Sequence, residues 1–311
     1  MPGATVPYTQ RFFALLELLK RESDADHRFQ QTALAEALEE KNHMPVDRRS
    51  VKKALDEMQK AGYPVIYDKG WYYDHEFSPT ELRYLGYSVR CNNTLPPEQQ
   101  ELLLDKIAQL GSKWYNRPDN ASILRTSNEH FLDNLAVLNA AIDEGIQVEF
   151  SYGDYDVDFR LHERLNRAGN KKLYVVNPYQ IATVNGRYYL IANVNKYDGL
   201  SHYRIDRIID AKKIKKKIKP LSMVTGQAST LNLPQYMAEH PYMYSGEPHY
   251  YRIRTKRSGI NDVLDWFGKN VRFENVDDKE SDVIVKSDSA SLEFWLKRYE
   301  KQAHFIQEEG T

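Results

Sequence analysis

The sequence predicts a multidomain α+β protein, because the spacing of its apolar residues changes along the chain. Its 311 residues exceed what a single hydrophobic core usually organises. Up to residue 144 the apolar residues recur mostly with the 3.6-residue period of helices, whereas from Gln147 onward they follow the shorter period of strands. A largely helical half is therefore expected to precede a β-rich half.

The composition argues against a membrane-spanning protein and against a protein held together by disulfides or a multi-cysteine metal site. Hydrophobic residues make up 41% of the chain and charged residues 28%, and no apolar run approaches the roughly 20 residues that would span a bilayer. Residues 1–10 lack the basic start and apolar stretch of a secretory signal, so a cytoplasmic location is expected. Cys91 is the only cysteine, which excludes an intrachain disulfide and a multi-cysteine metal site. With a net charge of -1, any affinity for DNA must come from local clusters of basic residues.

Residues 1–77 read as three helices followed by a hairpin. Helical periodicity covers Tyr8 to Lys20, then Gln31 to Glu40 with Thr32 as the expected N-cap, then the segment from the N-cap Asp47 to Lys60. Gly62 follows where a helix favours a left-handed residue. Two short runs, Val65 to Tyr67 and Trp71 to Tyr73, flank a polar turn and predict a hairpin. This order is typical of a winged helix-turn-helix, a DNA-binding domain.

The remaining chain divides by the same criteria. Residues 78–135 predict a helical linker, opened by Ser78 or Thr80 as N-cap. Residues 136–219 predict a small antiparallel β-barrel, with strands at Val148 to Tyr152, Leu173 to Tyr179, Gln180 to Val184, Arg187 to Val194 and His202 to Ile209. Residues 220–247 are a proline-rich connector with a short helix near Pro234 to Glu239. The order β-α-β-β-α-β in residues 248–311 predicts a small α/β sandwich.

The third helix carries the candidate DNA-binding face. Its basic residues lie opposite the apolar stripe of Val51, Ala54, Leu55 and Met58. Arginine in the first turn can pair with guanine edges, while lysines and backbone amides hold phosphates. The hairpin adds Lys69, with Trp71 and Tyr72 beside it. A solvated charged face is the alternative, since Asp47, Asp56 and Glu57 weaken the positive patch. The predicted DNA-binding residues are Arg48, Arg49, Ser50, Lys52, Lys53 and Lys69.

Several stretches in order resemble the WYL-domain transcription regulators of bacteria. They are Asp47-Arg48-Arg49-Ser50-Val51 running to Ala61-Gly62-Tyr63-Pro64-Val65, the Gly-Trp-Tyr-Tyr hairpin, Asn177-Pro178-Tyr179, Asn185-Gly186-Arg187-Tyr188-Tyr189-Leu190-Ile191-Ala192 and His202-Tyr203-Arg204-Ile205-Asp206-Arg207-Ile208. Tyr188 stands where the family usually has tryptophan. The resemblance covers nearly the whole chain and implies a winged helix, a helical linker, an Sm-like barrel that senses a ligand, and a WCX-like C-terminal extension.

The resemblance also implies a ligand pocket of basic and aromatic side chains. By position these are Tyr152, Tyr189, His202, Arg204 and Arg207. Guanidinium groups suit phosphate and aromatic rings stack on bases, so a small anionic ligand, a nucleotide or an oligonucleotide is the expected partner.

Both arginines of this set could have a structural role instead of binding a ligand. His202 and Arg204 alternate onto one face of a strand, whereas Arg207 should point to the other and could pair with Asp206 or another acid. Arg204 could instead form an internal ion pair with Asp156, Asp158 or Glu163.

The sequence predicts a DNA-binding regulator, with repression as the expected sense, that binds double-stranded DNA as a homodimer. Trp266, Phe294 and Trp295 are candidate dimer anchors or core residues. The alternatives are an RNA- or single-strand-binding factor without a regulatory role and an adaptor that binds only protein. Gly-rich phosphate loops, His-Glu-x-x-His and Gly-x-Ser-x-Gly are missing and the nine histidines are scattered, so no enzyme, metal site or cofactor is expected.

Overall fold

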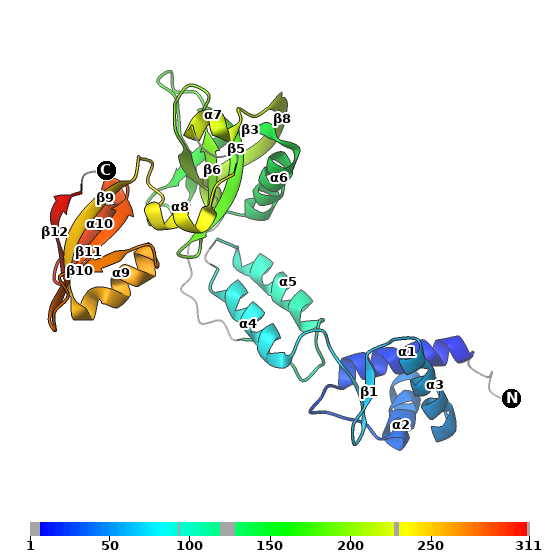
Figure 1. Ribbon diagram of the computed structural model, residues 1–311. Coiled ribbons are helices and arrows are strands. Elements are labelled where there is room, and N and C mark those ends of the chain that lie inside the picture. The colour runs from blue at the N-terminus through cyan, green and yellow to red at the C-terminus, as the bar shows by residue number, and fades with distance from the viewer. Residues whose placement is uncertain (1–6, 93, 119–127, 227–229, 310–311) are drawn as a thin grey trace. The chain divides into compact units, whose positions relative to one another are not determined.

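The computed structural model describes residues 7–92, 94–118, 128–226 and 230–309. Within them the chain is a mixed α/β protein with three antiparallel sheets (Figure 1). It forms two compact units, the first containing residues 7–92 and 97–118 and the second residues 94–96 and those from 128 onward. Among the helices of these segments, each is too short or too polar to cross a membrane.

The first unit is built around three helices and a hairpin. They are α1 (Tyr8–Glu22), α2 (Gln31–Asn42), α3 (Arg48–Lys60), β1 (Val65–Tyr67) and β2 (Trp71–Tyr73). The apolar stripe of each helix faces a shared core that includes Leu19, Leu34, Leu55 and Met58. Trp71, which stands beside Lys69 in the hairpin, is only 2% exposed and packs in this core.

The starts of α3 and α2 differ in their capping. Asp47 caps α3, since its Oδ1 accepts hydrogen bonds from the N–H groups of Arg49 at 2.8 Å and Ser50 at 3.0 Å. The expected cap at Thr32 is wrong. Helix α2 begins at Gln31, and its N-cap is Gln30, which makes no side-chain capping bond.

Two further helices, α4 (Pro79–Arg90) and α5 (Pro97–Ala108), belong to the first unit. Ser78 and Glu81 cap α4 reciprocally. The loop after α5 is fastened to the end of α1, because the N–H of Lys113 donates to the Arg21 carbonyl at 2.8 Å and Trp114 Nε1 donates to the Glu22 carbonyl at 2.9 Å. The helical pair is thereby joined to the three-helix body.

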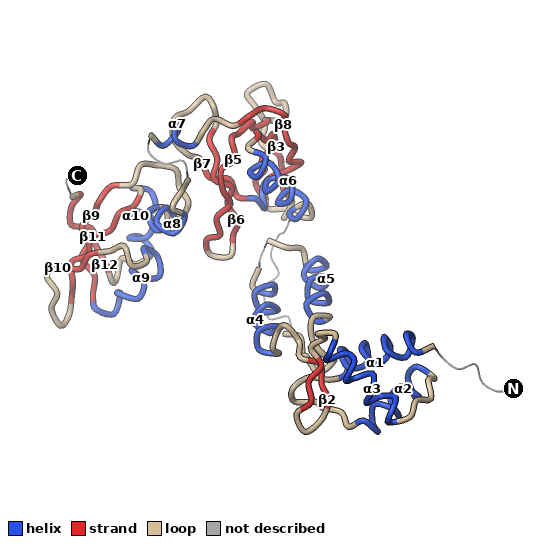
Figure 2. The backbone as a smooth tube through the Cα atoms, turned by 45° about the vertical axis from the view of Figure 1, so that its right-hand side comes forward, coloured by secondary structure: helices blue, strands red, loops and turns tan. Residues whose placement is uncertain are grey.

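The second unit begins with α6 (Phe131–Glu144), which packs on a six-stranded sheet (Figure 2). The sheet order is β4-β3-β5-β6-β7, with β8 paired to β3. The strands are β3 (Ile146–Tyr155), β4 (Leu161–Glu163), β5 (Leu173–Val184), β6 (Arg187–Asn193), β7 (Ser201–Arg204) and β8 (Ile208–Lys217). The two strands expected over 173–184 are one strand, β5, with a bulge between Pro178 and Gln180.

A short 3₁₀ turn, η1 (Ile205–Arg207), separates β7 from β8. The sequence predicted one strand from His202 to Ile209, and alternation along it placed Arg204 and Arg207 on opposite faces. The turn breaks that alternation. Most of the basic run from Lys212 onward lies in β8, paired with β3.

The chain ends in a four-stranded sheet of order β10-β11-β9-β12. After α7 (Leu221–Thr225) and α8 (Leu233–Glu239) come β9 (His249–Lys256), the 3₁₀ turn η2 (Arg257–Gly259), α9 (Ile260–Phe267), β10 (Arg272–Glu274), β11 (Glu280–Ser287), α10 (Ser289–Arg298) and β12 (Ala303–Glu308). Of the three expected dimer anchors, Trp295 is buried in the core, Trp266 is partly buried against Tyr242, and Phe294 is exposed.

The cap at Asp47 yields a stability prediction. Replacing Asp47 by Ala removes the acceptor for two N–H groups and should lower the free energy of unfolding by about 1 kcal/mol. Asp47→Asn keeps an acceptor oxygen and is the matched control, expected to cost a few tenths of that. Urea denaturation followed by circular dichroism measures both. Equal losses in the two variants would show that the capping bond is not what stabilises α3.

Candidate ligand and nucleic-acid sites

The end of β3 gathers most of the predicted ligand residues. Tyr152 is buried, and its hydroxyl oxygen accepts a hydrogen bond from the N–H of Arg204 at 3.0 Å. Burial raises the pKa of the Tyr152 phenol, which therefore stays neutral at physiological pH. Tyr189 of β6 lies directly opposite Arg204 in the register of β6 and β7. Arg207 is close enough to act electrostatically on Tyr152 as well.

Arg204 has an internal partner. Its Nε and Nη2 donate to the two carboxylate oxygens of Asp206 at 3.1 and 2.6 Å. The Asp206 side chain is only 6% exposed. The sequence offered Asp156, Asp158 or Glu163 as the internal partner of Arg204. The partner is instead Asp206, two residues along the chain. A buried ion pair of this kind is costly to break, because either partner left alone would be an uncompensated charge.

Arg207 shares an acid with an arginine that the sequence analysis did not select. Arg207 Nη1 donates to Asp154 Oδ1 at 3.0 Å, while Arg164 binds both oxygens of Asp154 at 2.6 and 3.0 Å. The Arg164 guanidinium also lies over the Tyr152 ring, 5.0 Å from its centroid. Arg164 holds the pKa of the Asp154 carboxyl below its usual value. The signal that could have found Arg164 is register, since β4 pairs with the end of β3 and places Gly153 opposite Glu163.

Gly153 permits this close pairing. A Cβ at Gly153 would lie 2.8 Å from the His162 carbonyl oxygen and equally close to Leu161. Only glycine lets β4 approach β3 here, and the approach brings Arg164 to Asp154.

The cluster of Arg164, Arg204, Arg207, Asp154 and Asp206, hereafter the arginine cluster, has an excess of positive charge. Three guanidinium groups face two carboxylates, which leaves one positive charge uncompensated. Arg207 Nε is a buried donor without a hydrogen-bond partner among the described residues. A site with spare donors and a positive charge is suited to an anion.

The His202 side chain contacts Tyr236 and His240 rather than the members of the arginine cluster, within the described residues. Its Nε2 is 2.7 Å from the Tyr236 hydroxyl on α8, and its ring centroid is 5.5 Å from that of His240. Burial, with a smaller contribution from the neighbouring His240, lowers the pKa of His202 to about 4, so the imidazole is neutral at physiological pH. The structure brings together Tyr152, Tyr189, Arg204 and Arg207 but not His202.

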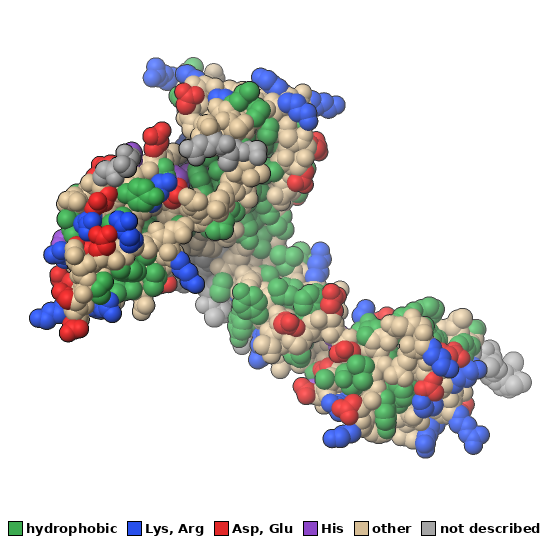
Figure 3. All heavy atoms as spheres, viewed as in Figure 1, with side chains coloured by type: hydrophobic (Ala, Val, Ile, Leu, Met, Phe, Trp, Pro, Cys, Tyr) green, Lys and Arg blue, Asp and Glu red, His purple; other side chains and the backbone are tan. Residues whose placement is uncertain are grey.

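The predicted DNA-binding residues lie on the exposed side of α3 and at the hairpin turn; Figure 3 shows Lys and Arg side chains on this unit. Lys52 pairs with Asp56 and lies 5.0 Å from the centroid of the Trp71 ring. Lys53 Nζ is 3.9 Å from Glu57 Oε1. Arg49 forms no ion pair within the described chain.

The other three predicted residues have local roles as well. Arg48 Nε donates to Gln31 at 3.2 Å, and the Ser50 hydroxyl donates to Asp47 at 2.6 Å. Lys69 occupies the hairpin turn with a φ of 54°.

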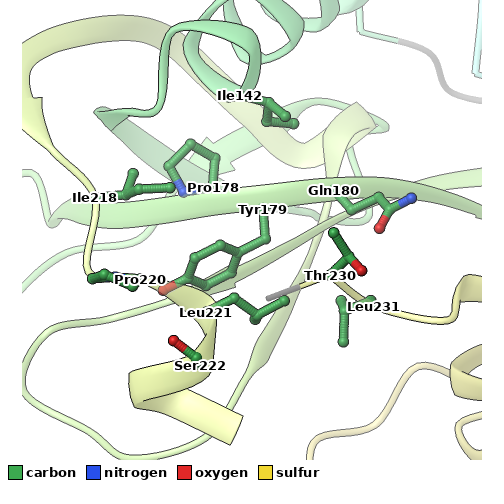
Figure 4. A pocket seen from close by; sticks show the side chains of 10 residues that line it. All are labelled: Ile142, Pro178, Tyr179, Gln180, Ile218, Pro220, Leu221, Ser222, Thr230 and Leu231. Carbon is green, nitrogen blue, oxygen red and sulfur yellow. The ribbon is translucent and has the colours of Figure 1, made fainter. Parts of the chain in front are cut away.

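A cavity of about 420 Å³ lies elsewhere in the second unit (Figure 4). Its walls come from α6, β5 and the segment around α7, and they include Ile142, Tyr179, Ile218 and Leu221. The Tyr179 hydroxyl donates to the Lys219 carbonyl at 2.7 Å. The predicted ligand residues do not line this mostly apolar cavity. In the part of the chain described, His, Cys, Asp and Glu form no group of three that could hold a metal ion.

Residues 133–213 match the family model of the WYL domain. No curated protein matches the chain. Among solved structures it is similar to proteasome accessory factor B/C (PafBC) of Arthrobacter aurescens, with 14% identity and a TM-score of 0.30, over 96% of this chain and 46% of that one. It is also similar to a CRISPR Cas-related protein, with 11% identity and a TM-score of 0.37, over 93% of this chain and 92% of that one. The chain thus spans less than half the length of the PafBC protein.

The lowered pKa of His202 predicts a pH-dependent stability. Between pH 6.5 and about 4 the unfolded chain binds a proton at His202 that the folded chain does not, so stability falls as the pH is lowered through this window. The full loss is on the order of 3 kcal/mol. His202→Gln removes the titrating group and should flatten the decline in melting temperature between pH 6.5 and 4. An unchanged decline in the variant would show that other groups cause it.

Proposed function

We propose that this chain, which carries a WYL domain at residues 133–213, is a DNA-binding transcription regulator whose β-rich half senses an anionic ligand. In this proposal residues 1–77 are a winged helix-turn-helix, residues 78–135 a helical linker and residues 136–219 an Sm-like barrel. Residues 220–247 are a connector, and residues 248–311 form a WCX-like α/β domain. The role of the chain is binding rather than catalysis.

The DNA-binding role is supported by one observation: α3 is amphipathic, with one apolar face and one basic face. One side, with Val51, Leu55 and Met58, is buried in the core of the first unit, while the other presents Arg48, Arg49, Lys52 and Lys53 to solvent. Arg48 and Arg49 occupy the first turn, the part of a recognition helix that meets base edges in the major groove. Arg49 lacks an acidic partner in the described chain, so binding DNA would break no existing ion pair there.

The sensing role is supported by the arginine cluster within the matched domain. Tyr152, Tyr189, Arg204 and Arg207 come together around one carboxylate-lined, positively charged site, which suits a nucleotide or a short oligonucleotide. We propose repression as the sense of regulation, with the ligand changing the affinity for the operator.

The competing function is that of an RNA- or single-strand-binding factor. A competition assay separates the two. A labelled duplex bound by the full chain is challenged with unlabelled duplex, single-stranded DNA or RNA of matched sequence. The proposal predicts that duplex competes best. Preferential displacement by a single strand would contradict it.

Substitutions on α3 test the DNA face directly. Arg49→Ala and Lys53→Ala should each weaken duplex binding and, if they contact phosphates, lower the slope of log K against log salt by about 0.9. Both side chains are exposed, so the melting temperature should stay unchanged. Lys60→Ala, an exposed charge at the opposite end of α3, is the matched control and should bind as wild type. Unchanged affinity in both test variants would remove α3 from the interface.

A homodimer is part of the proposal, because one recognition helix reads only about half of a symmetric operator. Phe294 is the exposed member of the expected anchors, and its ring lies 4.7 Å from that of Tyr242. Phe294→Ala should shift the protein toward monomer in light scattering at micromolar concentration. Phe305→Ala, which removes another half-exposed aromatic ring from the same domain, is the control. A monomeric wild type, with and without DNA, would contradict the dimer.

A further inference from the structure

Asp154 holds the two most accessible arginines of the arginine cluster. Its Oδ1 accepts from both Arg164 and Arg207 at 3.0 Å, and its Oδ2 accepts from Arg164 at 2.6 Å. All three side chains are open to solvent, with 47% of Asp154, 45% of Arg164 and 29% of Arg207 exposed. One carboxylate therefore binds the donors that an incoming anion would use.

Burial distinguishes this acid from the other acid of the cluster. The Asp206 side chain is 6% exposed and its partner Arg204 is 20% exposed, so separating them would leave a charge in a poorly solvated place. Asp154, by contrast, can move into water when it loses its partners, since exposed ion pairs contribute only about 0.2 to 1 kcal/mol each. A ligand can displace Asp154 at little cost, whereas the Arg204–Asp206 pair stays closed.

We propose that Asp154 is an internal competitor for the ligand, and that a phosphate ester binds by replacing the Asp154 carboxylate between Arg164 and Arg207. The inference rests on the proposed sensing function and adds to it the place where the phosphate binds, the competing role of Asp154 and a residue, Arg164, that the sequence did not indicate. Carboxylate and phosphate oxygens accept the same bidentate hydrogen bonds from a guanidinium group.

Two further features favour phosphate as the displacing group. Arg207 Nε is buried without a hydrogen-bond partner among the described residues, and rotation of the Arg207 side chain after Asp154 has left would turn this donor toward a third oxygen of the ligand, a bond that Asp154 does not make. A phosphate monoester dianion also balances the charge of the site, because its two negative charges and the one remaining carboxylate then face three arginines, whereas a singly charged diester leaves the excess of one positive charge unchanged.

Competition by Asp154 sets the concentration at which the sensor responds. A ligand must break the two Asp154 ion pairs before it binds, so its apparent affinity is lower than that of the open site. The β3–β4 pairing at Gly153 keeps Asp154 beside the arginines, so Asp154 competes with every ligand molecule that enters the site.

The experiment measures ligand affinity in the full chain by isothermal titration calorimetry. The probes are AMP, which has a terminal phosphate monoester, and unphosphorylated (dT)₄, which has only phosphodiesters. The variants are Asp154→Asn, Arg164→Gln and the control Asp156→Asn. Asp156 lies two residues further along the same hairpin, and Asp156→Asn removes the same charge. Within the described residues its side chain accepts a hydrogen bond from the N–H of Val157 and pairs with no arginine.

Asp154→Asn should bind the preferred probe about three- to tenfold more tightly than wild type, as expected from the loss of two exposed ion pairs. Asp156→Asn should stay within about twofold of wild type, and Arg164→Gln should bind at least tenfold more weakly. The probe that shows these effects identifies the phosphate as a monoester or a diester.

The contradicting outcomes are distinct. If wild type binds a probe but Asp154→Asn binds no more tightly than Asp156→Asn, the competition is refuted and the sensing function stands. If Arg164→Gln binds as wild type, the phosphate does not lie between Arg164 and Arg207. If wild type and every variant bind neither probe while duplex DNA is still bound, both this inference and the proposed sensing of a nucleotide fail. Melting curves for each variant establish that it is folded.

Discussion

The pairing of β3 with three other strands is the constraint on which the candidate sensor depends. Residues 148–151 of β3 pair with β5, residues 153–155 pair with β4, and its other edge pairs with β8. Since a shift of one residue would turn every side chain of a strand to the opposite face, this register is strongly specified. It buries Val148 and Phe150 in the core and places Tyr152 and Asp154 within reach of Arg164, the residue after β4, and of Arg207 in η1.

Burial then assigns different roles to chemically similar groups. Arg204 and Asp206 form a pair that is largely enclosed, so the pair is part of the scaffold and helps orient the backbone N–H that binds Tyr152. The ion pairs of Arg164 and Arg207 with Asp154 are exposed to solvent, where such pairs are weak and exchange readily. The same argument applies to α3, where Lys52 and Lys53 have acids four residues away and Arg49 does not. In both sites a basic side chain is available to an anion when it has no acidic partner or when that partner is exposed to solvent.

The sequence predicted helix ends and turns well where a residue type is favoured at one backbone position, such as a helix N-cap or a hairpin turn. Asp47 caps α3 as expected, and Asn185 and Gly186 take the positive φ values of 50° and 70° that a two-residue hairpin turn needs. The contacts of the arginines could not be predicted in this way. They depend on the β3–β4 register and on η1, where a 3₁₀ turn replaces the expected strand. The contacts of Trp71 and His202 could not be predicted for a related reason, since each packs against elements distant in sequence, the first against the helices of the first unit and the second against α8.

The central claim is that the β-rich half binds a phosphate-bearing ligand while α3 binds DNA, and the molecules that copurify with the protein test it most directly. Wild type and Arg207→Ala would be purified in parallel, denatured, and the released small molecules identified by mass spectrometry. A nucleotide or short oligonucleotide should be present in the wild-type sample and strongly depleted in the variant. A phosphate-free ligand, or a nucleotide retained equally by both proteins, would contradict it.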